Sequence, residues 1–210
     1  MNNYNYKRNI IKKINSKKLC ISVIGLGYVG LPLSLLLSKK DRVIGIDIDK
    51  KKINYLNLNK SYIERIENKK IHNFNKKNIF SNDFSKIFES DFIIICVPTP
   101  LKKDKSPDLS FIKNAVSKIK PNLKKGQTII LESTSYPGTT YDHIVKILSK
   151  NFIVGKEIFV GFSSERIDPG RNDNKIQRIP KVVSGHSKFC LEIISKFYEK
   201  HFTKVFKADS

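Results

Sequence analysis

At 210 residues the chain is long enough for one sizeable domain or at most two small ones. Its hydrophobic fraction of 40% allows a packed core, and no apolar run reaches the roughly 20 residues that span a bilayer. Residues 1–18 are polar and lysine-rich, which predicts a basic N-terminal tail and neither a signal peptide nor an anchor. We therefore expect a soluble cytoplasmic protein with no membrane partner.

The charge is strongly unbalanced, with 40 Lys and Arg against 19 Asp and Glu, for a net charge of +21. One interpretation is a polyanionic partner such as nucleic acid. However, the lysines are dispersed along the chain and aromatic residues do not interleave with them as in a stacking platform. We favour a compositional bias of the kind seen in proteins from AT-rich genomes, and expect no nucleic-acid partner.

The three cysteines, Cys20, Cys96 and Cys190, are odd in number and far apart in sequence. This spacing argues against a disulfide framework or a zinc site, and we expect no metal. Each lies in an apolar or amphipathic run, which favours a small buried side chain over a nucleophile.

Strand-like and helix-like segments alternate along the chain from residue 19. Short apolar runs predict strands, the strongest being Phe92 to Val97, which is apolar enough for burial on both faces. Helical periodicity and Asp or Ser caps predict the helices between them. The strands are expected at residues 19–24, 42–48, 79–81, 92–97, 128–131, 157–162, 181–184 and 203–206. The helices are expected at residues 31–39, 50–56, within 61–78, and at 84–89, 108–120, 139–150 and 187–201.

This alternation predicts an α/β fold with a doubly wound, mostly parallel sheet of the Rossmann type. No internal repeat and no Pro- or Gly-rich linker divides the chain. We therefore expect one domain, residues 19–210, preceded by the basic tail at residues 1–18.

A glycine-rich loop, Gly25-Leu26-Gly27-Tyr28-Val29-Gly30, joins the first expected strand to the first helix. A G-x-G-x-x-G motif alone is a weak signal, but between a strand and a helix it is typical of dinucleotide binding. Gly25 allows a tight turn, Gly27 lets the backbone approach a pyrophosphate, and Gly30 lets the helix pack closely. The helix N-terminus adds partial positive charge. The alternative is a strand–turn–helix without a ligand.

Asp47 ends the second expected strand, near the usual spacing for an acid that binds ribose hydroxyls. Its carboxylate favours NAD over NADP, because it would repel a 2′-phosphate. The neighbouring Asp49 suits a helix cap, which leaves Asp47 for the cofactor. Lys52, with Lys50 and Lys51, weakens the preference for NAD because these lysines tolerate extra phosphate, and we include Lys52 among the cofactor-binding residues.

Three later segments follow strands at the expected carboxyl edge of the sheet, where such folds bind ligands. They are Val97-Pro98-Thr99-Pro100, Glu132-Ser133-Thr134 and Ser163-Ser164-Glu165-Arg166. Each alone is compatible with an ordinary turn or cap. At three successive strand ends, they indicate a site.

Six short blocks follow one another along the chain. The first is the glycine loop, extended to Val23–Pro32. The other five are residues 96–100 (CVPTP), 107–110 (PDLS), 132–140 (ESTSYPGTT), 164–170 (SERIDPG) and 179–185 (IPKVVSG). In the order and spacing of these blocks, the chain from about residue 19 onward resembles the UDP-glucose/GDP-mannose dehydrogenases, and most closely those that act on UDP-N-acetylhexosamines, such as UDP-N-acetylglucosamine 6-dehydrogenase.

The resemblance implies oxidation of a UDP-sugar C6 hydroxyl to a carboxylate with two NAD⁺, through a cysteine-bound intermediate, to make surface polysaccharide precursors. It assigns Thr99 and Thr134 to the cofactor, and Thr134 also to the catalytic water. Glu165 is implied beside the reacting carbon, as a catalytic residue that positions or deprotonates that water. Residues 166–170, with Arg166 and Asp168, are implied to border the sugar, and Val97, Pro98 and Ser133 belong to the cofactor strand ends.

The resemblance also implies a central helix, a nucleophilic cysteine segment and a UDP-binding domain that follow position 210 in full-length members. We therefore expect an incomplete enzyme as a lone chain, with a separately supplied C-terminal half as one conceivable partner. Full-length members are expected to be homo-oligomers. The alternative functions are a non-catalytic NAD-binding remnant or subunit, or a basic nucleic-acid-binding protein.

Overall fold

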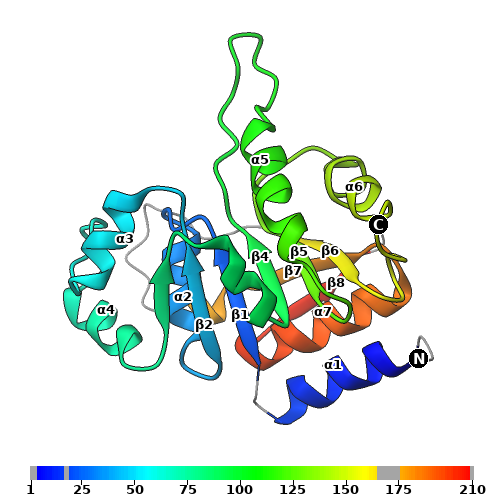
Figure 1. Cartoon of the computed structure of the whole chain (residues 1–210), viewed down its shortest axis with the longest axis horizontal. Helices are drawn as coiled ribbons and strands as arrows, with labels where there is room; N and C mark the ends of the chain where they lie inside the picture. The colour runs from blue at the N-terminus through cyan, green and yellow to red at the C-terminus, as the bar shows by residue number, and fades with distance from the viewer. Residues whose placement is uncertain (1–3, 17–18, 165–175, 209–210) are drawn as a thin grey trace.

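The computed structural model describes residues 4–16, 19–164 and 176–208, and its centre is a single eight-stranded sheet (Figure 1). The strand order is β3-β2-β1-β4-β5-β6-β7-β8, and every neighbouring pair is parallel except the antiparallel pair β6–β7. The strands are β1 (Cys20–Ile24), β2 (Arg42–Ile46), β3 (Ile79–Ser81), β4 (Phe92–Ile95), β5 (Thr128–Leu131), β6 (Phe159–Ser163), β7 (Lys181–Gly185) and β8 (Val205–Lys207). The predicted doubly wound Rossmann fold is confirmed.

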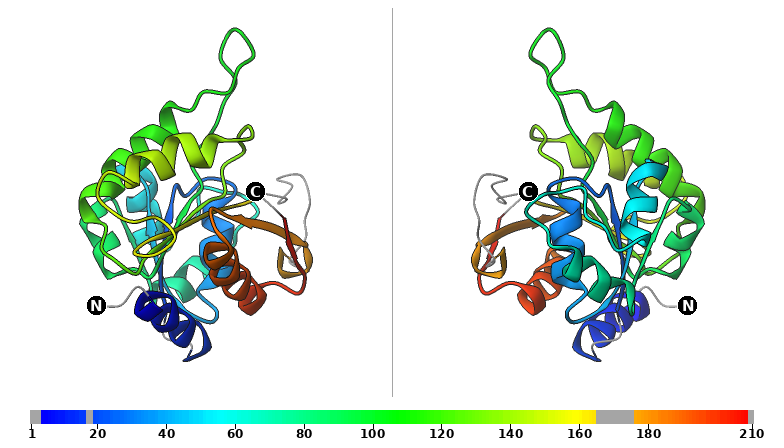
Figure 2. Two further views of the ribbon diagram at one scale, coloured as in Figure 1. Left: turned by 90° about the vertical axis from the view of Figure 1, so that its right-hand side faces the viewer. Right: turned by 90° about the vertical axis from the view of Figure 1, so that its left-hand side faces the viewer.

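Helices cover both faces of the sheet, so that the molecule has three layers (Figure 2). One apolar core lies between the sheet and α1, α2, α3, α4 and α7, and a second lies under η1, α5, η3 and α6. The α-helices are α1 (Tyr4–Ser16), α2 (Gly30–Leu37), α3 (Lys50–Asn57), α4 (Asn68–Asn75), α5 (Ser110–Ile119), α6 (Lys146–Leu148) and α7 (Lys188–His201). The shorter helices are the 3₁₀ turns η1 (Phe84–Glu89), η2 (Lys120–Asn122) and η4 (Ile176–Arg178), and the π-helix η3 (Tyr141–Val145).

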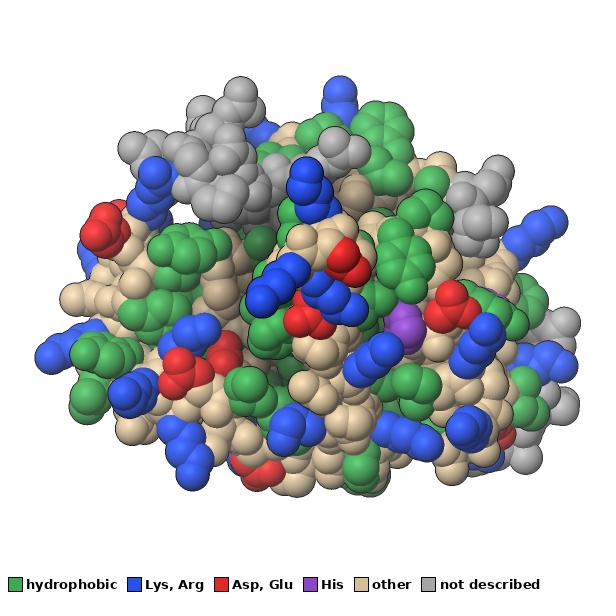
Figure 3. Space-filling model, turned by 90° about the horizontal axis from the view of Figure 1, so that it is seen from above, with side chains coloured by type: hydrophobic (Ala, Val, Ile, Leu, Met, Phe, Trp, Pro, Cys, Tyr) green, Lys and Arg blue, Asp and Glu red, His purple; other side chains and the backbone are tan. Residues whose placement is uncertain are grey.

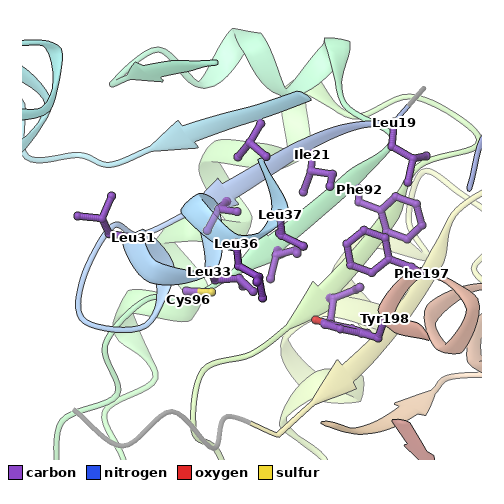
Figure 4. Close-up of a cluster of buried hydrophobic side chains, with 14 of the residues drawn as sticks. Leu19, Ile21, Leu31, Leu33, Leu36, Leu37, Phe92, Cys96, Phe197 and Tyr198 are labelled. Carbon is purple, nitrogen blue, oxygen red and sulfur yellow. The ribbon is translucent and has the colours of Figure 1, made fainter. Parts of the chain in front are cut away.

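The central strands are buried on both faces, as the apolar run of β4 predicted. Phe92 of β4 stacks on Phe197 of α7 with ring centroids 4.2 Å apart, and Tyr198 meets Phe197 edge-on (Figure 4). These contacts tie α7, which packs mainly on β6, β7 and β8, to the central strand β4, and they place Tyr198 within reach of the strand ends described below.

The N-terminal segment differs from the prediction, because most of the expected basic tail forms helix α1. Ile10 and Ile14, one turn apart, are buried against the first core, and α1 lies beside α7 (Figure 1). Lys13 also pairs with Asp91 at 2.6 Å, next to the start of β4. The abundance of lysine concealed this four-residue apolar spacing. Among the described residues no helix is both long and apolar enough to cross a membrane.

Other differences are local. The β6 strand begins at Phe159, two residues later than predicted, because the backbone of Glu157 is used in turns with Gly126 and Ile153. The helix predicted at residues 139–150 contains the π-helix η3, which widens one turn. Between β4 and α5 a narrow hairpin, closed by a bridge from Leu101 to Pro107, projects beyond the carboxyl edge of the sheet (Figure 1).

Candidate functional site

The strand order reverses between β1 and β4, which lie side by side although β2 and β3 come between them in sequence. Their following connections leave in opposite directions, to α2 on one face and α5 on the other. Such a switch point opens a crevice outside the carboxyl ends of the strands, where doubly wound folds bind ligands. The glycine loop and the segment after β4 both lie at this edge.

The three motif glycines have three different surroundings. Gly25 has φ +91°, and a Cβ there would lie 2.7 Å from the carbonyl oxygen of Cys96. A Cβ on Gly30 would lie 1.8 Å from the carbonyl oxygen of Gly25, so α2 packs directly on the loop. A Cβ on Gly27 would meet no atom within 4 Å. The first and third glycines are therefore required by the fold, whereas the second faces open space at the N-terminus of α2.

The loop residues between these glycines also differ in exposure, with one facing solvent and one packed on the core. Tyr28 is 62% exposed at the edge of the crevice, whereas Val29 is half-buried and packs on the first core. The N–H of Leu31 donates to the carbonyl of Gly27 at 3.1 Å, which continues the helical hydrogen bonding into the loop. The loop is thus a fixed part of the strand–helix connection, with its open side at Gly27.

Asp47 is buried at the end of β2 and holds the glycine loop in place. Its Oδ2 accepts the N–H of Leu26 at 2.8 Å, and its Oδ1 accepts the N–H of Asp49 at 2.9 Å. The ammonium of Lys52 lies 3.6 Å from Oδ2. Each carboxylate oxygen has a further lone pair, so these bonds leave acceptor capacity for ribose hydroxyls. The carboxylate predicted for the cofactor therefore also anchors the loop.

Asp49 caps α3 as predicted, because its carboxylate accepts the N–H groups of Lys51 and Lys52. Tyr62 also contacts the glycine loop, which the sequence analysis did not predict. Its hydroxyl donates to the carbonyl of Leu26, the residue whose N–H is held by Asp47. Burial, with Asp47 and Asp49 nearby, raises the pKa of Tyr62, so the hydroxyl keeps its proton and remains a donor.

The ends of β4 and β5 are tied to each other. The hydroxyl of Ser133 donates to the carbonyl of Val97 at 2.7 Å, and the N–H of Ser133 donates to the carbonyl of Ile95 at 3.2 Å. Pro98 and Thr134 are exposed, and Thr99 is partly exposed, at the same carboxyl edge. The structure thus brings the predicted segments after β4 and β5 together beside the glycine loop.

A buried polar cluster lies beneath this edge and was not predicted. The ammonium of Lys181 lies 2.9 Å from one oxygen of Glu132, and the hydroxyl of Tyr198 donates to the other. Glu132 was noted only as part of a strand end. Its partners come 49 and 66 residues later, so only the fold brings them together.

The third predicted segment is described only in part. Ser164 follows β6, and its N–H donates to the carbonyl of Val182 at 3.1 Å. Glu165, Arg166 and Asp168 lie outside the described residues. All three cysteines are buried, as expected for small apolar side chains, and Cys96 packs close to Gly30.

Seen from the carboxyl edge, lysine and arginine side chains are dispersed, with acidic and apolar side chains between them (Figure 3). The described residues contain no group of three or more His, Cys, Asp or Glu that could hold a metal ion. The features concentrated at this edge are the open glycine loop, the buried acid beside it and the two joined strand ends.

Comparison with known proteins agrees with this geometry. Protein CapL of Staphylococcus aureus is 37% identical over 90% of this chain, and UDP-N-acetyl-D-glucosamine 6-dehydrogenase of Salmonella typhi is 34% identical over 90%. The chain spans 45% of each of these relatives, or about half their length. Among solved structures, the UDP-N-acetyl-mannosamine dehydrogenase Cap5O from S. aureus superimposes with a TM-score of 0.84 at 31% identity. That match covers 91% of this chain and 47% of Cap5O.

Residues 19–202 match the NAD binding domain of a known enzyme family. This match covers the glycine loop, Asp47 and both strand ends of the site, and it confirms the resemblance carried by the six sequence blocks. The chain belongs to the UDP-glucose/GDP-mannose dehydrogenase family, as an NAD-binding domain.

Proposed function

We propose that this chain is the NAD-binding part of an enzyme that oxidises the C6 hydroxyl of a UDP-N-acetylhexosamine to a carboxylate, in the synthesis of surface polysaccharide precursors. The observation that carries the proposal is the open space at Gly27, beside the buried Asp47 at the β1–β4 switch point. Relatives that are UDP-N-acetyl-glucosamine and UDP-N-acetyl-mannosamine dehydrogenases support the substrate class. The cytoplasmic location stays a prediction.

The residues of the glycine loop are proposed to bind the pyrophosphate, because a backbone without a Cβ at Gly27 can approach it closely and α2 points its N-terminus there. Asp47 accepts hydrogen bonds from a ribose and disfavours a 2′-phosphate, while Lys52 moderates its charge. Tyr28 and Val29 complete the loop. When bound, NAD⁺ supplies the hydride acceptor for the oxidation.

The ends of β4 and β5 are proposed to receive the other half of the cofactor. Val97, Pro98 and Thr99 border it from β4, and Ser133 and Thr134 border it from β5. In this proposal Thr134 also holds the catalytic water. The resemblance adds Glu165 as the group that positions or deprotonates this water, and Arg166 and Asp168 as sugar contacts.

The first experiment tests cofactor binding by titrating the purified chain with NAD⁺ and NADP⁺ in a calorimeter. We expect saturable binding of NAD⁺ in preference to NADP⁺, and Asp47→Asn should reduce that preference. Asp49→Asn is the matched control, because it removes the same charge two residues away and keeps a capping oxygen. No NAD⁺ binding by the wild type, or equal effects of the two variants, would contradict the proposal.

The second experiment separates a part of an enzyme from a non-catalytic NAD-binding subunit. The chain is mixed with the C-terminal half of S. aureus CapL, NAD⁺ and either UDP-N-acetylglucosamine or UDP-N-acetylmannosamine, and NADH absorbance is followed. NADH formation that requires both halves supports the enzymatic function of this chain as the NAD-binding half. NAD⁺ binding without NADH, also in a covalent fusion of the two halves, favours the non-catalytic alternative.

A further inference from the structure

The buried cluster of Glu132, Lys181 and Tyr198 joins the carboxyl edge of the sheet to helix α7. The side chains of Lys181 and Glu132 are 2% and 0% exposed. The Lys181 ammonium also lies over the rings of Tyr198 and Phe202, at 5.6 and 5.4 Å. Burial and the adjacent Glu132 raise the pKa of Tyr198 well above its usual range, so the phenol remains a hydrogen-bond donor.

Stability alone does not account for this cluster. Moving a carboxylate and an ammonium out of water is costly, and well-packed apolar residues of similar volume are often as stabilising or more so. Hydrogen-bonded ionic groups differ from apolar groups because they are directional. The cluster therefore restricts where the backbone of Glu132 lies more tightly than apolar packing would.

That backbone is continuous with the proposed cofactor contacts. The N–H groups of Glu132 and Ser133 both donate to the carbonyl oxygen of Ile95, at 2.9 and 3.2 Å. The Ser133 hydroxyl donates to the carbonyl oxygen of Val97. The β5 end is therefore held by β4 on one side and by the Glu132 carboxylate on the other. Thr134, the next residue, is exposed at the edge.

Lys181 extends the same restraint to a third strand end. It is the first residue of β7, and its N–H donates to the carbonyl of Lys204 at 3.0 Å, which ties it to the segment before β8. Its neighbour Val182 accepts the N–H of Ser164 just after β6. The buried ion pair of Glu132 and Lys181 thereby joins the ends of β5 and β6.

We propose that Glu132, Lys181 and Tyr198 are positioning residues, which hold Ser133 and Thr134 where the nicotinamide half of the cofactor binds. The inference rests on the proposed function and adds to it the residues that set the geometry of the β5 end. It predicts a selective defect. Disturbing the cluster loosens contact with the nicotinamide and spares contact with the adenosine half, which binds at Gly27 and Asp47.

The test measures saturation transfer from the protein to bound NAD⁺ by NMR, with nicotinamide and adenine protons compared in one sample. Tyr198→Phe removes one hydroxyl and leaves the ring, and Glu132→Gln/Lys181→Met removes both buried charges together. The control is Lys200→Met, which breaks another shielded ion pair, 2.6 Å from Asp41, at the opposite edge of the sheet. All three variants are checked for folding by thermal unfolding and titrated with ADP-ribose, which lacks the nicotinamide.

We expect the nicotinamide-to-adenine ratio to fall at least about threefold in both cluster variants, because small displacements of contacting groups weaken binding steeply. Affinity for ADP-ribose should stay within about twofold of wild type, and the ratio for Lys200→Met should not change. A normal ratio in folded Tyr198→Phe and in the double variant would overturn the proposal. So would parallel losses of nicotinamide and adenine signals, or a wild type whose nicotinamide receives no saturation. If the wild type shows no adenine signal either, the proposed function itself fails.

Discussion

Adding one methyl group at Gly27 or at Gly30 is predicted to have opposite consequences, although the two residues belong to the same loop. A Cβ on Gly30 would lie 1.8 Å from the carbonyl oxygen of Gly25 and 3.2 Å from Cβ of Cys96. A Cβ on Gly27 would meet nothing within 4 Å. The pair therefore separates the glycine that the fold needs from the one that the ligand needs.

The cost of Gly30→Ala follows from the contact it creates. The methyl is about 1.6 Å too close to the Gly25 oxygen for ordinary contact, so the start of α2 must move away from β1. Overpacking a buried site costs about 1–3 kcal/mol or more, and the contact is with backbone. The preference of alanine over glycine in a helix returns about 1 kcal/mol at most. We expect a net loss of about 2 kcal/mol, a sizeable share of a typical 5–15 kcal/mol.

Gly27→Ala should change the free energy of unfolding by about 0.5 kcal/mol or less, because the site is open and its φ lies outside the left-handed region. The same methyl occupies the space through which the pyrophosphate is proposed to approach. A loss of about 1.4 kcal/mol in binding corresponds to a tenfold weaker affinity for NAD⁺. We expect at least about that loss.

Urea unfolding followed by circular dichroism gives the stabilities, and calorimetric titration with NAD⁺ gives the affinities. A Gly27→Ala variant that binds NAD⁺ as well as wild type would refute the role of Gly27 in binding. A Gly30→Ala variant as stable as Gly27→Ala would refute the role of Gly30 in the fold. Gly27→Ser is a further check, because its larger side chain should weaken NAD⁺ binding more than Gly27→Ala does while leaving the fold intact.

Three further predictions concern the scaffold. Asp49→Ala should lower the free energy of unfolding by about 1 kcal/mol, through loss of the α3 cap, and an unchanged urea midpoint would contradict this. Ile10→Ala should undock α1, so amide exchange should rise across residues 4–16 and stay unchanged in β4. Burial lowers the pKa of His201, with Lys200 and Lys40 adding to the effect against Asp41, so the folded chain keeps this histidine neutral where the unfolded chain protonates it, and stability is lost as pH falls below about 6.5. Unfolding free energy should therefore fall between about pH 7.5 and 5.5 less steeply in His201→Gln than in wild type.

Local patterns were sufficient to predict the sheet and the loop. The run from Phe92 to Ile95 is apolar at every position, as suits a strand covered on both faces, and it forms the central strand β4. Asp49 was correctly predicted as the cap of α3, because a cap must stand immediately before its helix. These features depend on neighbours within a few residues, so their signals are present in the sequence itself.

Contacts that depend on tertiary structure left no such signal. Glu132, Lys181 and Tyr198 belong to different elements, and nothing in their spacing indicates that they meet. Tyr62 reaches the loop from a polar segment in which only short helices were predicted. Helix α1 is a different case. Its Ile10–Ile14 spacing was visible, but a lysine-rich composition outweighed it.

Asp47 shows why the predicted cofactor acid is a less direct probe of binding than Gly27. Its carboxylate joins the end of β2 to Leu26 in the loop, so a substitution there alters both the proposed ribose contact and the scaffold beneath the pyrophosphate. A weaker affinity in Asp47→Asn thus has two sources, which the preference for NAD⁺ over NADP⁺ separates. Loss of the scaffold weakens the binding of both cofactors, whereas loss of the carboxylate charge reduces the preference for NAD⁺ over NADP⁺. A methyl group at position 27 meets no atom of the chain within 4 Å, so Gly27→Ala acts on the ligand alone.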